Sequence, residues 1–399
     1  MRVLVEGSGG ADGWPQPGCR CASCLRHEGR RERSTIVVDG VVRLGVDGVV
    51  RLGVDGVVRL GVDGVARLGV DGVARLGVDG VVRLGGGEPG DVSGYRIRQL
   101  ADAHDPAEPG GWDITGPDGG RLLYPARPGA VPVPPEGAAA YDIAFLDLLG
   151  EPAQLGLLRA RGLVTGNTVT AVAFADHRVS AEGELRRRCG FWQAQLSGDG
   201  EAVTTVRSAE KRLKARRAPW RVLVLGGARS GKSAQAELRL AGEPDVTYVA
   251  TGAAEGAGGT EDPEWAARVA AHRARRPTWW RTVETTDLAG VLAGARGALL
   301  IDGIGTWLAA AMDECGAWDG SAEGAARLTA RVAGLVGAWR QAGAYVVAVS
   351  DEAGLGVVPG TRAGRMFRDE LGWLNQALAA ESEEAELVVA GRVVPLPAG

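Results

Sequence analysis

The run VLVLGGARSGKS, from Val222 to Ser233, holds the residues best suited to chemistry. It fits G-x-x-x-x-G-K-[ST], a loop whose backbone N–H groups surround phosphate oxygens at the start of a helix. Lys232 would reach the β- and γ-phosphates, and the Ser233 hydroxyl would bind a magnesium ion between them. The alternative is an ordinary glycine-rich turn. We predict a triphosphate site made of Gly226, Gly227, Ala228, Arg229, Ser230, Gly231, Lys232 and Ser233.

The elements around this loop predict an α/β fold. The apolar run 222–225 is typical of a buried parallel strand, and helical segments separate it from further strand candidates at 247–250, 298–301, 345–349 and 387–389. This alternation predicts a P-loop NTPase-type doubly wound sheet. Ligands of such sheets bind beyond the carboxyl ends of the strands. The residues to examine are therefore Thr251-Gly252, Asp302-Gly303 and Ser350-Asp351-Glu352.

Asp302 follows the apolar run ALLI directly. P-loop enzymes keep an acid that holds magnesium, directly or through water, at this position. The alternative is an ordinary aspartate at a strand end. With a phosphate loop upstream, we predict that Asp302 and Ser233 hold Mg²⁺.

His272 lies in DPEWAARVAAHRARRP, which predicts a helix that begins at Asp262-Pro263 and ends before Pro277. Arg268 precedes it by one turn and several arginines follow, so the patch suits phosphate oxygens. Taken alone, His272 is typical of a surface helix residue. A neutral imidazole can nevertheless attack phosphorus.

Composition limits the function classes. The chain has 399 residues, enough for two domains, and its formal net charge is −4. This charge gives no general reason to expect nucleic acid or an anionic membrane as a partner. No apolar stretch is long enough to span a bilayer, and the N-terminal apolar run is brief, so we expect a cytoplasmic protein.

We expect three segments: a first domain over 1–207, a basic linker over 208–220 and a second domain over 221–399. We interpret the linker run KRLKARR as a solvated surface, and a nucleic-acid-binding patch is the alternative. Within the first domain, residues 38–85 repeat the unit VDGVVRLG six times with two alanine departures. Each Asp-Gly pair suits a hairpin turn, and a flexible excursion is the alternative. We assign the repeat no function.

The second domain resembles the bifunctional adenosylcobinamide kinase and adenosylcobinamide-phosphate guanylyltransferase of cobalamin synthesis. The resemblance is carried in order by GGARSGKS, VTYVATG, the His272 segment, LLIDGIGTWL and VSDEAGLGVVP, and it spans 221 to about 397. It implies that adenosylcobinamide is phosphorylated by GTP or ATP, and that GTP then delivers GMP to that phosphate. His272 matches the histidine that carries the guanylyl group.

The resemblance also implies a homotrimer, with catalytic roles for His272, Lys232 and Asp302. We also predict nucleotide binding by Thr251, Arg268, Glu284 and Glu352. One departure is Asp351, which occupies a position where the family usually has asparagine.

The first domain resembles a degenerate metallo-β-lactamase-like hydrolase of α/β class. Cys19, Cys21 and Cys24 look like a structural zinc site, with His177 as the fourth ligand. A closed set of three cysteines and one histidine suits Zn²⁺, and three reduced thiols on a loop are the alternative. The chain has only four histidines, and of the later metal positions of a two-metal hydrolase only His104 looks retained. We therefore expect no hydrolysis by this domain.

Two other functions stay open for the second domain. It could be a different small-molecule P-loop kinase, which would never carry a guanylyl group. It could also be a non-catalytic nucleotide-binding scaffold. Only the cobinamide enzyme requires GTP and a covalent intermediate at His272.

Overall fold

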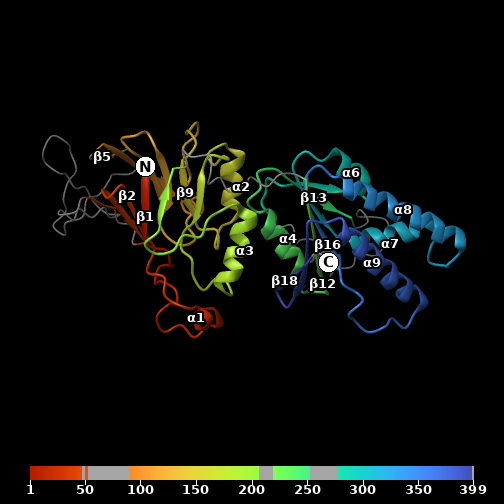
Figure 1. Ribbon diagram of the computed structural model, residues 1–399. Helices are drawn as coiled ribbons and strands as arrows, with labels where there is room; N and C mark the ends of the chain where they lie inside the picture. The colour runs from red at the N-terminus through yellow and green to blue at the C-terminus, as the bar shows by residue number, and fades with distance from the viewer. Residues whose placement is uncertain (47–49, 53–89, 93, 206–218, 252–275, 398–399) are drawn as a thin grey trace. The chain divides into compact units, whose positions relative to one another are not determined.

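The computed structural model describes residues 1–46, 50–52, 90–92, 94–205, 219–251 and 276–397 (Figure 1). The chain divides into two compact units, Met1–Ala215 and Arg216–Gly399. All of the predicted linker except 219–220, most of the repeat and the segment with Arg268 and His272 lie outside the described residues. Among the residues described, no helix has the length and apolar character needed to cross a membrane.

The first unit contains two β-sheets with a shared core. Val3, Ile36 and Leu44 from one sheet and Trp112 and Phe145 from the other belong to a single buried cluster. The five-stranded sheet has the order β11-β1-β2-β3-β4 and is antiparallel: β1 (Arg2–Gly7), β2 (Thr35–Val38), β3 (Val42–Gly45), β4 (Val50–Leu52) and β11 (Ala202–Thr204).

The second sheet of this unit is mixed. Its order is β10-β9-β8-β7-β6-β5, and the pairs β8–β9 and β9–β10 are parallel. Three helices belong to this unit among the described residues. The elements are β5 (Gly90–Val92), β6 (Tyr95–Ala101), β7 (Pro109–Thr115), β8 (Arg121–Pro125), β9 (Ile143–Leu146), β10 (Val169–Val172), α1 (Ala22–Arg26), α2 (Ala153–Ala160) and α3 (Glu182–Trp192).

The first copy of the repeat forms a hairpin. Strands β2 and β3 pair around Asp39 and Gly40, whose φ angles are +48° and +76°. An Asp-Gly pair tolerates two successive positive φ angles, which explains the turn. Val38 and Val42 on either side of it are fully buried. The later copies lie almost entirely outside the described residues.

The second unit is built on a seven-stranded sheet of order β14-β13-β15-β16-β12-β17-β18. Every neighbouring pair is parallel except β17–β18. The strand predictions at 222–225, 247–250, 298–301, 345–349 and 387–389 are confirmed, whereas β14 and β18 were not predicted. The strands are β12 (Trp220–Gly226), β13 (Val246–Ala250), β14 (Arg281–Glu284), β15 (Ala298–Asp302), β16 (Tyr345–Asp351), β17 (Glu384–Val389) and β18 (Arg392–Leu396).

Helices cover both faces of this sheet, as a doubly wound fold requires. Val222 and Val224 of β12 pack on the face covered by α4, and Leu223 and Leu225 pack on the opposite face. Successive strand residues point to opposite faces, so one apolar run supplies both cores. The helices are α4 (Lys232–Leu240), α6 (Leu288–Gly294), α7 (Ile304–Cys315), α8 (Ala322–Gln341) and α9 (Arg362–Ala380).

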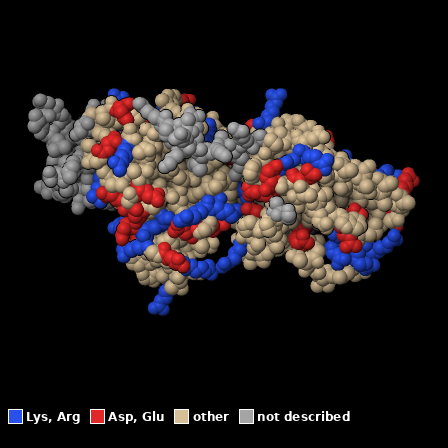
Figure 2. All heavy atoms as spheres, viewed as in Figure 1, with Lys and Arg blue, Asp and Glu red and all other residues tan. Residues whose placement is uncertain are grey.

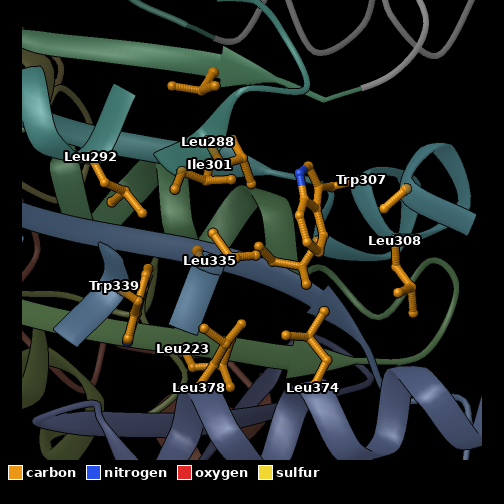
Figure 3. Close-up of a cluster of buried hydrophobic side chains, with 14 of the residues drawn as sticks. Leu223, Leu288, Leu292, Ile301, Trp307, Leu308, Leu335, Trp339, Leu374 and Leu378 are labelled. Atoms are coloured by element: carbon orange, nitrogen blue, oxygen red, sulfur yellow. The ribbon is translucent and has the colours of Figure 1, made fainter. Parts of the chain in front are cut away.

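The larger core lies between the sheet and helices α6 to α9. Figure 3 shows Trp307 and Leu308 of α7, Leu335 and Trp339 of α8 and Leu374 of α9 gathered around side chains of the strands. Fully burying one such leucine contributes about 1.5–3 kcal/mol. This packing fixes the strand ends from which the loops of the site emerge.

Charged side chains of both signs are interspersed on the visible face of each unit (Figure 2). On α3, Arg186 pairs with Glu182, and Arg187 and Arg188 pair with Glu184. Local pairing of this kind neutralises the basic run on α3.

Candidate active site

The predicted phosphate loop connects β12 to α4, and helix α4 begins at Lys232. Two glycines are required by the geometry. A Cβ on Gly226 would lie 2.4 Å from Ser230 Oγ and 2.7 Å from the Val388 carbonyl oxygen, and Gly231 has a φ of +98°. Arg229 also adopts a positive φ, +57°. These angles turn the loop so that α4 presents its N-terminus to the site.

The turn between β17 and β18 braces this loop. The Gly391 N–H donates to the Ser230 carbonyl oxygen at 2.8 Å, and the Glu352 N–H donates to the Gly226 carbonyl oxygen at 3.1 Å. Ser230 Oγ is buried and has no hydrogen-bond partner among the described residues. The loop is therefore held from two sides before any ligand binds.

Lys232 forms an ion pair inside the site. Its Nζ lies 2.8 Å from Asp351 Oδ1 and donates to the Gly227 carbonyl oxygen at 3.2 Å. Asp351 is the register partner of Gly226 across β12 and β16, so the sheet itself brings the two residues together. Asp351 thus gives the predicted phosphate-binding lysine an acidic partner.

Ser233 and Asp302, the two predicted magnesium ligands, meet at the carboxyl edge. Ser233 Oγ donates to Asp302 Oδ1 at 3.2 Å, and Tyr248 Oη donates to Asp302 Oδ2 at 3.0 Å. Burial, followed by the neighbouring Asp302 carboxylate, raises the pKa of the Tyr248 hydroxyl above its ordinary range. Tyr248 therefore stays protonated and is the hydrogen-bond donor in this contact.

The other predicted nucleotide-binding residues have different surroundings. Thr251 is fully buried, and its hydroxyl contacts the Gly303 carbonyl oxygen at 2.5 Å and the Thr306 hydroxyl at 2.6 Å. Glu352 accepts from the Gly354 N–H at 2.9 Å. Glu284 is exposed at the end of β14. Thr251 therefore orders the start of α7, while Glu352 shapes the loop that follows β16.

Two residues of the predicted guanylyl-transfer patch, Arg268 and His272, lie outside the described residues. Arg276, four positions after His272, is described, and its guanidinium carbon lies 3.7 Å from the centroid of the Tyr248 ring. Its Nη1 also donates to Thr282 Oγ1 at 3.4 Å. Arg276, the last arginine of the predicted patch, thus packs on Tyr248, whose hydroxyl contacts Asp302.

In the first unit, Cys19, Cys24 and His177 bring their ligand atoms within 4.8 Å of one another. Cys21, the other predicted zinc ligand, caps α1: its Sγ accepts from the Cys24 N–H at 3.4 Å, which lowers the pKa of the Cys21 thiol. Burial raises the pKa of the Cys24 thiol to about 11. His177 Nδ1 is buried and lacks a hydrogen-bond partner in the described part of the chain.

A second polar cluster follows β9 and β10. The Asp147 side chain is fully buried, and Arg178 bridges it to Asp176 at 2.6 and 2.8 Å. His104, the remaining predicted hydrolase position, is 61% exposed and lies 3.4 Å from Glu151. In this part of the structure, therefore, a guanidinium occupies the space between the two carboxylates.

Sequence reasoning missed two features of the site, Tyr248 and the Lys232–Asp351 ion pair. The signal for Tyr248 was a hydroxyl inside the apolar run VTYVA, which needs a buried partner. No local pattern could reveal the ion pair, because it depends on the register between β12 and β16.

Comparisons with known proteins identify relatives of the second unit. The family model described as cobinamide kinase / cobinamide phosphate guanyltransferase matches residues 222–396. The chain is 41% identical over 184 residues to the bifunctional adenosylcobalamin biosynthesis protein CobP of Pseudomonas aeruginosa, covering 44% of this chain and 96% of that relative. It is also 37% identical to the bifunctional adenosylcobalamin biosynthesis proteins CobU of Escherichia coli and of Salmonella typhimurium. Each of these matches covers 43% of this chain and 96% of the relative. The chain belongs to the cobinamide kinase / cobinamide phosphate guanyltransferase family.

Proposed function

We propose that the second unit phosphorylates adenosylcobinamide and then transfers GMP from GTP to adenosylcobinamide phosphate, giving adenosylcobinamide-GDP. The observation that carries the proposal is the convergence of Lys232, Ser233 and Asp302 at the carboxyl edge of the sheet, in a chain of this family. The phosphate donor of the first step is GTP or ATP.

In the kinase step, the backbone N–H groups from Gly226 to Ser233 surround the phosphates, and Lys232 exchanges Asp351 for phosphate oxygens. Ser233 Oγ and Asp302 Oδ1 are hard oxygen donors 3.2 Å apart, the donor chemistry that Mg²⁺ prefers. When bound, the ion would neutralise charge on the β- and γ-phosphates. The oxygen of the substrate hydroxyl attacks the γ-phosphorus, and its proton passes to solvent. A new P–O bond forms, the bond from the γ-phosphorus to the β,γ-bridging oxygen breaks, and the nucleoside diphosphate leaves.

In the transferase step, the unprotonated nitrogen of His272 attacks the α-phosphorus of GTP. A P–N bond forms, the bond from the α-phosphorus to the bridging oxygen breaks, and pyrophosphate leaves. A phosphate oxygen of adenosylcobinamide phosphate then attacks the same phosphorus. The P–N bond breaks and the imidazole is restored. Arg268 supplies positive charge to the phosphates, and Glu284 and Glu352 complete the nucleotide site. The buried Thr251 supports this site by holding the Gly303 carbonyl oxygen.

The test is intact-protein mass spectrometry of the full chain after incubation with GTP and magnesium. We expect a GMP-sized, acid-labile adduct that is absent in His272→Ala and retained in the matched control His104→Ala, which removes an exposed histidine of the first unit. Product analysis with adenosylcobinamide completes the assay. A folded chain that binds GTP but forms no adduct would contradict the transferase step. Phosphorylation without an adduct would identify another small-molecule kinase, and nucleotide binding without turnover a scaffold.

We further propose that the first unit binds a structural zinc ion through Cys19, Cys24 and His177, with Cys21 as the fourth ligand. The support is a cluster of soft donors within 4.8 Å and a buried, unpartnered His177 Nδ1. Metal analysis of the purified full chain should give one zinc that Cys24→Ser loses and Cys189→Ser, another buried cysteine, retains. Equal zinc in the two variants would refute this assignment. The homotrimer and the cytoplasmic location stay predictions.

A further inference from the structure

Tyr248 is a buried residue with a polar contact that the proposed mechanism does not yet use. It lies in the middle of β13 with 7% of its surface exposed. Its register partner in the neighbouring strand β15 is Leu300. Asp302 is two residues further along β15, so it shares a face with Leu300 and with Tyr248. The fold thus places the phenol beside the predicted magnesium ligand on the face covered by α4.

The hydroxyl of Tyr248 fixes one oxygen of that ligand. It donates to Asp302 Oδ2 at 3.0 Å, while Ser233 Oγ donates to Oδ1 at 3.2 Å. If the Ser233 hydroxyl bound a cation, it would no longer donate to Asp302 Oδ1. Asp302 Oδ1 would then be the carboxylate oxygen that faces the phosphate loop. The Tyr248 contact leaves Asp302 with a single orientation for this purpose. Outer hydrogen bonds of this kind orient metal-binding carboxylates.

The ring of Tyr248 is itself held in place. Arg276 lies over it at 3.7 Å and also contacts Thr282, the register partner of Tyr248 in β14. The backbone of Tyr248 is paired on both sides, by β14 and by β15. A side chain held in this way on a strand that is paired on both sides has few alternative rotamers, so its hydroxyl keeps a defined position.

We propose that Tyr248 is a positioning residue that aligns the Asp302 carboxylate for the magnesium of the bound nucleotide. This inference rests on the proposed function for its substrate, and it adds a residue that acts through Asp302 without touching the phosphates. Removal of the hydroxyl alone should weaken magnesium binding in the nucleotide complex about tenfold, the effect typical of outer-shell partners. Nucleotide binding without magnesium should not change.

The experiment titrates magnesium into the full chain with a fluorescent GTP analogue and measures nucleotide affinity from EDTA to saturating magnesium. Tyr248→Phe keeps the ring under Arg276 and removes only the hydroxyl. We expect an unchanged affinity in EDTA and a half-saturating magnesium concentration about tenfold higher than in the parent. Asp302→Asn removes the carboxylate charge and should give the largest rise in the half-saturating magnesium concentration.

Tyr345→Phe is the matched control, because it deletes a buried tyrosine hydroxyl at the amino end of β16, where Tyr345 contacts Arg239. It should leave the magnesium titration unchanged. The proposal fails if Tyr248→Phe titrates like the parent, or if it loses affinity equally with and without magnesium. A parent chain that shows magnesium-dependent nucleotide binding but does not phosphorylate adenosylcobinamide would instead refute the proposed function and leave the role of Tyr248 intact.

Discussion

Asp351→Asn should tighten nucleotide binding, because Asp351 competes with phosphate for Lys232. The pair is 2.8 Å apart, and the side chains of Lys232 and Asp351 are 15% and 50% exposed. A partly exposed pair of this kind contributes up to about 1 kcal/mol. Two like charges about 4 Å apart in a water-like medium cost about 1 kcal/mol more. Together these terms give about 1–2 kcal/mol, which corresponds to roughly 5- to 30-fold in the dissociation constant.

The assay is an equilibrium titration with a fluorescent, non-hydrolysable GTP analogue in excess magnesium. Asparagine is nearly isosteric with aspartate, so the backbone of β16 should be unaffected. The gain should shrink at high salt, because salt screens partly exposed charges. Asp245→Asn removes the same charge at the amino edge of the sheet, where Asp245 pairs with Arg281, and should not change the affinity. Unchanged or weaker binding by Asp351→Asn would refute the competition.

Three further predictions concern stability. Leu308→Ala leaves a cavity at a fully buried position and should lower the free energy of unfolding of the second unit by about 3 kcal/mol in a urea titration. Leu355→Ala, at a 79% exposed position, should change this free energy little. Arg178→Met leaves the buried Asp147 carboxylate without its cation and should lower the free energy of unfolding of the first unit by about 3 kcal/mol. Arg186→Met, which removes a side chain that is 70% exposed, should lower it by less than about 1 kcal/mol. Equal losses would contradict a buried ion pair. Burial lowers the pKa of His27 below 6.5, so the unfolded state binds more protons in this range, and the stability of the first unit should fall as the pH drops through 6.5 and below. His27→Gln should lack this component in urea titrations across that range.

Strands with continuous apolar runs could be predicted because parallel strands covered on both faces must be apolar throughout. This applies to β12, β15 and β16. The edge strand β14 has four exposed residues, and β18 carries Pro395 and mostly exposed side chains. Their pairing depends on neighbouring strands, and the local sequence carries no periodic signal for it. The same limit applies to the short strands of the first unit.

The site also contains residues that the sequence could predict and contacts that it could not. Motif spacing placed Lys232 and Ser233, and the end of an apolar run placed Asp302, because parallel strands finish at a common edge. Contacts across the sheet could not be read in this way. The ion pair of Lys232 with Asp351 depends on tertiary register, as does the bond from Tyr248 to Asp302. Cys21 illustrates the same limit in the first unit, since its Sγ accepts the Cys24 N–H at a helix start.

Arg178, between Asp147 and Asp176, gives the first unit a counterion that is encoded in its own chain. Carboxylates buried together repel unless a cation joins them, and a cation taken from solution makes a fold depend on supply. An arginine remains charged at every physiological pH and cannot be removed by a chelator. At this position the buried carboxylates therefore stay paired when divalent cations are scarce, whatever happens at the separate cluster of Cys19, Cys24 and His177.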